Sequence, residues 1–204
     1  MKKLLILSLL LCLLLQGCTL PSVVQNPVET TEGETVIQYI LDEQSVHNAF
    51  SKALEVYGWF DICSMETDTS RSIDRNGVTY YKTVNSEVST YKELRTLVYS
   101  LFSVETGEKL LRENEENPPY IDYNGDLYCL DAARGADITK GEYTAEVEYI
   151  SNTSILYKVK VEIIDFDENA GIDNYRKVVG YEDYTYKYEY INHKWVFTDF
   201  SLFY

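Results

Sequence analysis

An acidic stretch that starts at residue 165 begins like a calcium-binding loop. Asp165, Asp167 and Asn169 follow the D-x-D-x-N pattern that supplies the first oxygen ligands of such a loop. The pattern then fails, because the sixth position should be a glycine and is Ala170. The twelfth position should be a glutamate and is Arg176. Strand-like residues flank the stretch, so we interpret it as an acidic hairpin loop without a metal.

The histidines form neither a zinc site nor a catalytic triad with their neighbours in the sequence. His47 and His193 are the only two histidines, and neither lies near a nucleophile motif or at a spacing typical of zinc ligands. We therefore predict that the protein is not an enzyme and holds no metal or cofactor. An isomerase-like pocket, made of an aspartate base and tyrosine donors, is left open by the composition.

Two cysteines fall in the part of the chain that we expect to fold. Neither Cys63 nor Cys129 has a histidine near it in the sequence, so a catalytic thiolate pair is not indicated. In an exported protein the two could form a disulfide, and two buried thiols are the alternative.

The N-terminal segment has the pattern of an export signal. Lys2 and Lys3 precede an apolar run over residues 4–15, which is about as long as the core of a secretory signal and shorter than the ~20 residues of a membrane span. The run ends in Leu-Gln-Gly followed by Cys18, which resembles the lipobox of bacterial lipoproteins. The resemblance implies cleavage before Cys18 and a diacylglycerol on its sulfur. Because two acyl chains anchor a protein stably, we expect a membrane-bound protein on the extracytoplasmic face.

This interpretation divides the chain into three parts. Residues 1–17 are the predicted signal peptide. Residues 18–34 combine the lipidated cysteine with prolines, threonines and acids in no regular period, which predicts a flexible tether. Residues 35–204 are long enough for one domain with its own core.

The charge balance is strongly acidic. The chain has 18 Lys and Arg against 33 Asp and Glu, a formal net charge of −15. Cleavage of the signal would remove Lys2 and Lys3 and no acid, and would leave the exported part more acidic still. This charge argues against nucleic acid as a partner and favours cationic partners. Attachment to a membrane would then depend on the lipid.

Helical periodicity follows the predicted tether. Apolar residues recur at the spacing of one helix face and predict a helix of about four turns, which Gly58 could close; they are Val46, Ala49, Phe50, Ala53, Leu54 and Tyr57. A second helix is predicted to begin at a capping box formed by Thr90 and Glu93. A short third helix over residues 104–113 leads to an acidic loop that ends in Pro118 and Pro119.

Strand signals fill most of the rest. Asn76-Gly77 and Asn124-Gly125 are strong hairpin turns. From residue 120 onward we expect strands almost without interruption, with long runs at 143–150, 155–166, 177–191 and 195–203. Many of the 19 tyrosines lie in these runs, where rings pack and hydroxyls stay hydrated. The order predicts an α+β fold, with N-terminal helices on one face of a curved antiparallel sheet rich in tyrosine.

Four segments together resemble the IseA family of D,L-endopeptidase inhibitors; they are residues 53–60, 78–81, 91–102 and 120–135. Members are exported proteins of Gram-positive bacteria that restrain papain-like peptidases, which cut the stem peptides of peptidoglycan. The resemblance covers the chain from about residue 40 to its end and implies a cystatin-like or nuclear-transport-factor-like roll. It marks no specific inhibitory residue, and the lipobox is a departure from the family.

An inhibitor of this kind needs a rigid protrusion that fits the cleft of the peptidase, and negative charge would speed its docking to a basic groove. Two acidic loops are candidates for the contact: Glu113, Glu115 and Glu116 in the first, and Asp165, Asp167, Glu168 and Asp173 in the second. The alternative is that both loops are simply solvated and contact no partner. The expected partners are therefore a papain-like cell-wall endopeptidase and, through the lipid, the membrane.

A different function is a ligand-binding or sensory lipoprotein that uses the concave face of the roll. Its pocket would contain Tyr128 and Arg134. Arg134 could instead staple its own loop, since Gly135 permits a turn and Asp131 and Asp137 lie close in the sequence.

Overall fold

The computed structural model describes residues 23–29, 35–166 and 176–204 of the chain. These residues form two compact units, which divide at residue 45. The first unit is a hairpin of β1 (Val23–Glu29) and β2 (Thr35–Leu41), antiparallel from Val23 opposite Leu41 to Glu29 opposite Thr35. The expectation of an irregular tether over residues 18–34 is therefore wrong for Val23–Glu29, whose backbone groups pair with a strand further along the chain.

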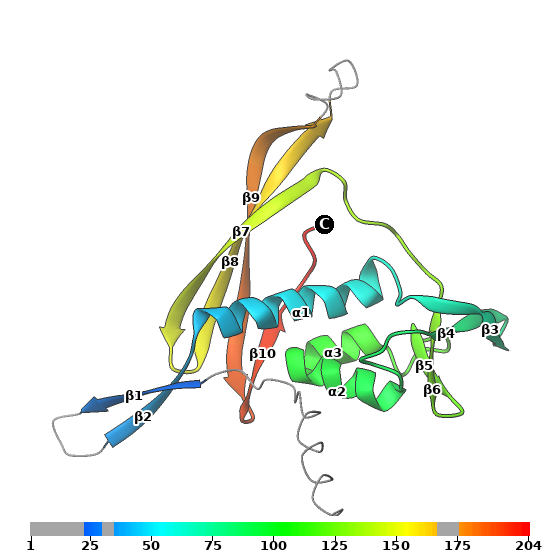
Figure 1. Cartoon of the computed structure of the whole chain (residues 1–204), viewed down its shortest axis with the longest axis horizontal. Helices are drawn as coiled ribbons and strands as arrows, with labels where there is room; N and C mark the ends of the chain where they lie inside the picture. Colours follow the sequence, from blue (N-terminus) through cyan, green and yellow to red (C-terminus); the bar gives the residue numbers. More distant parts are fainter. Residues whose placement is uncertain (1–22, 30–34, 167–175) are drawn as a thin grey trace, which may run out of the picture. The chain divides into compact units, whose positions relative to one another are not determined.

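The second unit contains a large four-stranded antiparallel sheet (Figure 1). Its strand order is β10-β9-β8-β7, with bounds β7 (Lys140–Ser151), β8 (Ser154–Phe166), β9 (Arg176–Ile191) and β10 (Lys194–Asp199). The register places Tyr157 opposite Tyr186, and Tyr188 opposite Phe197. These four side chains are buried and lie on one side of the sheet, which we call its inner face.

Helix α1 (Glu43–Asp61) packs on the inner face through Phe50. The ring of Phe50 stacks on Tyr157 with centroids 4.1 Å apart and also contacts Tyr186 and Phe197. The predicted apolar stripe is confirmed at four of its six residues, which are buried: Val46, Phe50, Ala53 and Leu54. Aromatic contact therefore joins the helix to the sheet.

The end of α1 differs from the prediction. The helix does not close at Gly58 but continues to Asp61. Phe60 packs edge-to-face on Tyr120 with centroids 5.1 Å apart, and the amide of Ile62 donates to the Gly58 carbonyl at 2.9 Å. Tertiary contact beyond the glycine offsets its cost inside a helix, which is about 1 kcal/mol relative to alanine.

A second four-stranded sheet, the small sheet, has the order β3-β4-β6-β5. Its strands are β3 (Thr67–Arg75), β4 (Val78–Thr83), β5 (Tyr120–Tyr123) and β6 (Asp126–Leu130). Both predicted hairpin turns are confirmed. Asn76 and Gly77 have φ of 51° and 77°, and Asn124 and Gly125 have 55° and 85°, the left-handed pair that a type I′ turn needs.

The single curved sheet was a wrong prediction. The hairpin of β5 and β6 pairs with β4, through Tyr81 opposite Cys129, and not with the strands that follow it. Tyr80, Ile121 and Tyr128 form a buried cluster on the small sheet. Local alternation identifies these strands, but the apolar surface they bury decides which strands they join.

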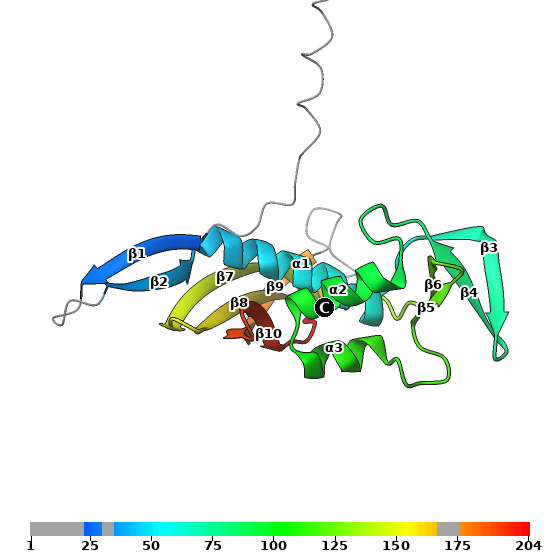
Figure 2. The ribbon, with the colours of Figure 1, turned by 90° about the horizontal axis from the view of Figure 1, so that it is seen from below.

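Helices α2 (Tyr91–Leu101) and α3 (Val104–Leu111) lie side by side, as Figures 1 and 2 show, and both contact β10. The predicted capping box is present. The amide of Glu93 donates to the Thr90 hydroxyl at 3.2 Å, and the amide of Thr90 donates to the Glu93 carboxylate at 3.0 Å. Between the two helices, the amide of Ser103 donates to the carbonyl of Phe197 at 2.9 Å. This bond attaches the helix pair to the edge of the large sheet.

The predicted α+β class is confirmed, with helices and antiparallel sheets of the expected kinds. Among the helices that the structure describes, none is long and apolar enough to cross a membrane.

Candidate functional site

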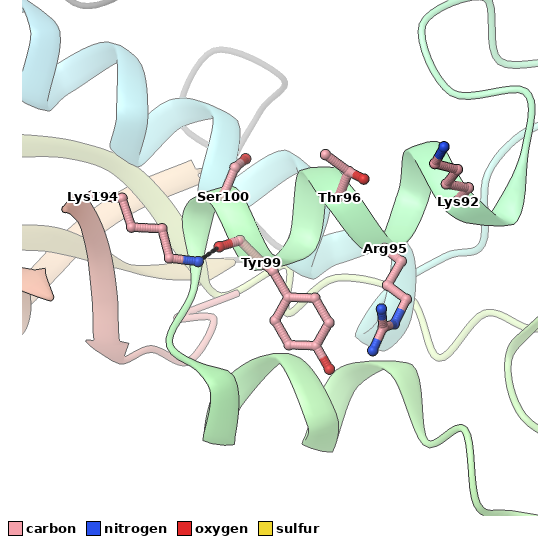
Figure 3. Close-up of a pocket in the computed structure, with 6 residues that line it drawn as sticks. All are labelled: Lys92, Arg95, Thr96, Tyr99, Ser100 and Lys194. Atoms are coloured by element: carbon pink, nitrogen blue, oxygen red, sulfur yellow. Dashed lines mark hydrogen bonds between the residues drawn. The ribbon is translucent and has the colours of Figure 1, made fainter. Parts of the chain in front are cut away.

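A hollow of about 440 Å³ runs along the exposed side of α2 (Figure 3). We call it the α2 hollow; its lining residues are Lys92, Arg95, Thr96, Tyr99, Ser100 and Lys194. The first five follow one another at helical spacing and so share one face of α2, and Lys194 is the first residue of β10. Among the residues that the structure describes, three cationic and three hydroxyl-bearing side chains line the hollow, and no carboxylate does.

Lys194 is positioned by the end of α2. Its ammonium donates to the backbone carbonyl of Tyr99. That carbonyl lies in the last turn, where helical carbonyls lack an amide partner and where a cation is favoured by the helix dipole. An ammonium has three hydrogens, so Lys194 keeps donors after this bond.

Arg95 connects the α2 hollow to the acidic loop. Its Nε donates to the carboxylate of Glu113 at 3.1 Å, and its guanidinium lies 5.1 Å from the centre of the Tyr99 ring. Tyr91 donates its hydroxyl to the same carboxylate at 2.9 Å. Burial, followed by this bond to Glu113, raises the pKa of Tyr91. The acid that neutralises Arg95 therefore stands at the rim of the hollow.

Gly107 in α3 makes room for the Tyr99 ring. A Cβ at this position would lie 2.7 Å from Cε1 of Tyr99, closer than real contacts of this kind. The absent side chain lets the ring lie directly against α3. The sequence shows Gly107 inside a short predicted helix, and that unfavourable placement is the signal that could have identified a close helix contact.

The acidic loop, residues 112–119, is held by its backbone. Arg112 ends α3 in the left-handed region at φ 48°, and its carbonyl accepts from the amide of Glu115 at 2.9 Å. Further along, the Glu116 carbonyl accepts from the Asn76 side chain at 3.2 Å. The Pro118 carbonyl accepts from the hydroxyl of Tyr80 at 2.9 Å. The small sheet therefore fixes the path of this loop.

The carboxylates of the acidic loop differ in their environment. Glu113 is bonded to Arg95 and Tyr91, whereas Glu115 pairs only loosely with Arg112 at 3.8 Å. Glu115 and Glu116 are exposed. Glu113 is exposed as well, so the loop presents all three acids to solvent, and Glu113 also holds the loop to α2 through Arg95 and Tyr91.

The other predicted residues are placed as follows. Asp165 is exposed near the end of β8, opposite Lys177 of β9. Asp167, Glu168 and Asp173 lie outside the described residues, as does Cys18 with the signal segment.

Neither Tyr128 nor Arg134 lines the α2 hollow, and the two do not share a pocket there. Tyr128 is buried in the cluster on the small sheet. Arg134 is exposed and bonds to the carboxylate of Asp61 at 2.6 Å and to the carbonyl of Tyr204 at 3.2 Å. The Asp61 carboxylate raises the pKa of Arg134. This geometry fits the interpretation that Arg134 holds its own loop in place. Its acidic partner is Asp61, and not Asp131 or Asp137, which lie closer in the sequence.

Cys63 and Cys129 are both free, so the disulfide alternative is not the one observed. Cys63 is exposed, which also differs from the expectation of two buried thiols. Cys129 is buried, and burial raises the pKa of its thiol to about 12. At neutral pH the Cys129 thiol therefore stays protonated and inert.

His47 has a contact that the sequence pattern did not indicate. His47 is not part of the apolar stripe of α1, yet its Nδ1 lies 2.7 Å from the hydroxyl of Tyr157 and hydrogen-bonds with it. Tyr157 comes from β8, so only the packing of α1 on the inner face brings the pair together.

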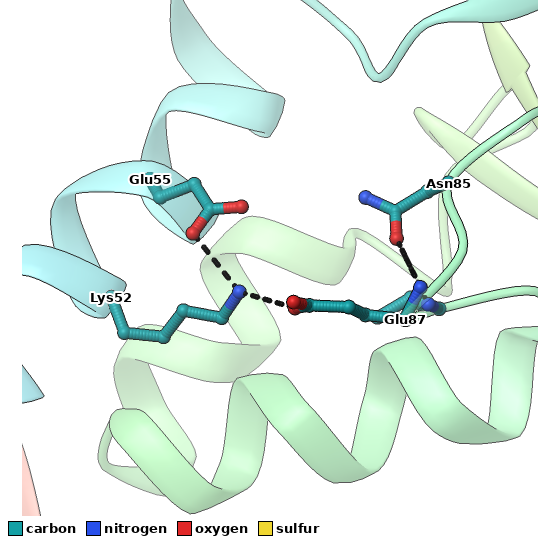
Figure 4. A network of polar contacts seen from close by, with 5 residues as sticks. Lys52, Glu55, Asn85 and Glu87 are labelled. Atoms are coloured by element: carbon teal, nitrogen blue, oxygen red, sulfur yellow. Dashed lines mark hydrogen bonds and ion pairs between the residues drawn. The ribbon is translucent and has the colours of Figure 1, made fainter.

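A polar network holds α1 to the segment before α2 (Figure 4). The ammonium of Lys52 lies 2.9 Å from Glu55 and 2.7 Å from Glu87. Asn85 accepts hydrogen bonds from the amides of Glu87 and Val88, at 2.9 and 3.0 Å. This Asx turn aims Glu87 at the helix, and the network orders the approach to the capping box of α2.

A second hollow of about 480 Å³, the sheet hollow, lies over the strands β7, β8 and β9. Its charged lining is balanced, with Glu146 and Asp183 against Lys158 and Lys160. The α2 hollow is therefore the more selective of the two for charge.

In the described part of the chain, no three His, Cys, Asp or Glu residues gather as metal ligands. Comparisons with protein-family models and with curated proteins give no match for this chain.

Proposed function

We propose that this protein is a cell-envelope lipoprotein, tethered to the membrane by a lipid on Cys18, that binds and inhibits a papain-like D,L-endopeptidase of the cell wall. The lipobox-like N-terminus and the resemblance to the IseA family motivate the proposal. The protein acts by occupying the enzyme, so it needs no nucleophile of its own.

The observation that carries the proposal is the fixed backbone of the acidic loop. A protrusion that is already ordered loses little conformational entropy when it enters a cleft. Hydrogen bonds from Asn76 and Tyr80 provide that order, while Glu115 and Glu116 remain exposed for contact. The acidic balance, a formal net charge of −15 for the full chain and more negative once the predicted signal is removed, would add long-range attraction to a basic enzyme groove.

The test is the digestion of peptidoglycan by the catalytic domain of a D,L-endopeptidase, titrated with the full chain in nonionic detergent. We expect saturable inhibition that weakens when the salt concentration rises from about 50 to about 300 mM, because salt screens exposed charges. The double variant Glu115→Gln/Glu116→Gln should weaken inhibition by roughly tenfold, since each acid at the contact contributes on the order of 0.5–1 kcal/mol.

The matched control is Glu142→Gln/Glu146→Gln, which changes the net charge equally at two exposed positions of β7. It should retain inhibition at the level of the unmodified chain. If both variants lose inhibition equally, the effect comes from the net charge of the protein and not from a contact at the acidic loop. No inhibition of several papain-like wall peptidases would refute the proposal.

A further inference from the structure

The α2 hollow carries positive charge that the fold does not neutralise. Within the described part of the chain, Lys92 makes no ion pair, and Lys194 is bonded to an uncharged carbonyl. Only Arg95 has an acidic partner, Glu113. Counting that pair as neutral leaves the charges of Lys92 and Lys194, about two in all, on a protein that is otherwise strongly acidic.

Donors that could hold an anion surround this charge. The Nε of Arg95 is used by Glu113, but its two terminal nitrogens make no hydrogen bond to the residues that the structure describes. Thr96 and Tyr99 are also among the lining residues, but Figure 3 shows the Tyr99 hydroxyl turned toward α3, on the other side of α2 from the Thr96 hydroxyl. A guanidinium fork matches the oxygen geometry of phosphates and carboxylates, and the ammonium groups of Lys92 and Lys194 line the same hollow.

The size of the hollow and the surrounding charge limit the ligand. A volume of about 440 Å³ lies in the range of small-molecule sites. An extended polyanion would meet the negative charge of the rest of the molecule, whereas a compact anion would contact only the cationic lining. The sheet hollow is of similar size but its charges cancel, so it lacks this preference.

We propose that the α2 hollow is a binding site for a compact organic dianion, a phosphate monoester or a dicarboxylate, held by Lys92, Arg95 and Lys194. The hydroxyl of Thr96 supplies a further hydrogen bond. This site is separate from the contact proposed for a peptidase. The proposal of an anion site therefore does not depend on whether the protein inhibits a peptidase.

The test is a titration of the full chain, labelled with ¹⁵N in nonionic detergent, at constant ionic strength. The probes are phenyl phosphate and glutarate, with neutral phenol as the uncharged comparison. We expect saturable shifts of amide signals confined to α2, Lys194 and the Arg95-bonded Glu113. Tighter binding of phenyl phosphate would identify a phosphate ligand, and tighter binding of glutarate a dicarboxylate; either result supports the site.

Lys92→Gln should weaken binding roughly three- to tenfold, the effect of one charge-assisted contact at an exposed site. Because Lys92 is exposed and unpaired among the described residues, this variant should unfold at the same urea concentration as the unmodified chain. The matched control is Lys187→Gln, which removes one positive charge from an exposed position on β9. Equal weakening in both variants, or shifts that never saturate with either anion, would overturn the proposal.

Discussion

In the large sheet, tyrosine rings from β8 and β9 pack on Phe50 of α1, whereas in the small sheet two tyrosine hydroxyls donate to backbone carbonyls, one in the acidic loop and one in α1. Phe50 lies within 4.1 Å of Tyr157 and 5.0 Å of Tyr186, measured between ring centroids. On the small sheet, Tyr80 donates to the Pro118 carbonyl, and Tyr120 donates to the Trp59 carbonyl at 3.0 Å.

The difference indicates how each sheet is stabilised. Apolar burial is non-directional and is shared among many ring contacts. A buried hydroxyl that bonds to a carbonyl is directional, and its loss leaves the carbonyl unsatisfied. The large sheet should therefore respond mainly to lost volume, and the small sheet more strongly to the loss of single oxygen atoms. The large sheet shares some of the directional bonding, because Tyr186 donates its hydroxyl to the carbonyl of Ser201 at 3.0 Å.

The largest effect is expected for Phe50→Ala. The change removes the ring at the centre of the aromatic core and leaves a cavity, so the free energy of unfolding should fall by about 3–5 kcal/mol. Urea unfolding measures this loss. Ile138→Ala, at a side chain that is 73% exposed, serves as the control and should change stability by less than about 0.5 kcal/mol. If Phe50→Ala loses little unfolding free energy, the large sheet does not depend on the packing of aromatic rings on Phe50.

Tyr120→Phe should cost about 1–3 kcal/mol, although it removes only one oxygen atom. The hydroxyl donates to Trp59 and accepts from the amide of Met65 at 3.1 Å, so two backbone groups lose their partner. Tyr123→Phe, at an exposed position of the same strand, is the matched control and should be nearly neutral. If the two variants unfold at the same urea concentration, the small sheet does not depend on the Tyr120 hydroxyl.

Alkaline pH should act on the buried tyrosines of the large sheet. Burial raises the pKa of Tyr188 from 10.0 to about 12. Below pH 10 the hydroxyl is protonated in both states and stability is unaffected. Between pH 10 and about 12 the unfolded chain loses this proton more readily, so the free energy of unfolding falls as pH rises.

Tyr188→Phe tests this pH dependence through urea unfolding at pH 7, 9, 10 and 11. The variant should lose stability less steeply above pH 10, by up to about 1.4 kcal/mol per pH unit for the one missing proton. Tyr181→Phe, exposed on the same strand, should follow the unmodified chain. If the unfolding free energies of Tyr188→Phe and the unmodified chain fall in parallel with pH, the raised pKa of Tyr188 does not cause the pH dependence.

The smallest effects are expected at two helical glycines, Gly58 of α1 and Gly107 of α3, and they should have opposite signs. Nothing lies within 4 Å of a Cβ at Gly58, so Gly58→Ala should stabilise α1 by about 0.5–1 kcal/mol. At Gly107 the added carbon would meet Tyr99, and crowding should exceed the gain in helix propensity by about 1 kcal/mol. Thermal unfolding of both variants measures the difference, and a shift in the same direction would show that α3 can move away from Tyr99.

The parts of the fold that the sequence predicted are local. Thr90 and Glu93 lie three residues apart and cap α2 as expected. Asn76-Gly77 and Asn124-Gly125 adopt the left-handed conformations that their turns need. Such features depend on a few neighbouring residues, so tertiary packing rarely overrides them.

The candidate site was predicted less well, because its contacts join distant residues. Glu113, Glu115 and Glu116 were identified as an acidic loop, but the bond from Arg95 and the support from Tyr80 were not. No sequence pattern joins Lys194 to α2, since that contact exists only once β10 lies beside the helix.

The sequence alone determined the α+β class, the helix cap, the hairpin turns and the acidic balance, because propensity, periodicity and charge are properties of short segments. Only the tertiary structure decided that the described strands after α1 form two separate four-stranded sheets, that Arg134 pairs with Asp61 across the fold, and that cations of α2 and β10 line one hollow. Strand partners and ion pairs between distant residues follow from the apolar surface that the whole chain buries, and a short sequence segment does not contain that information.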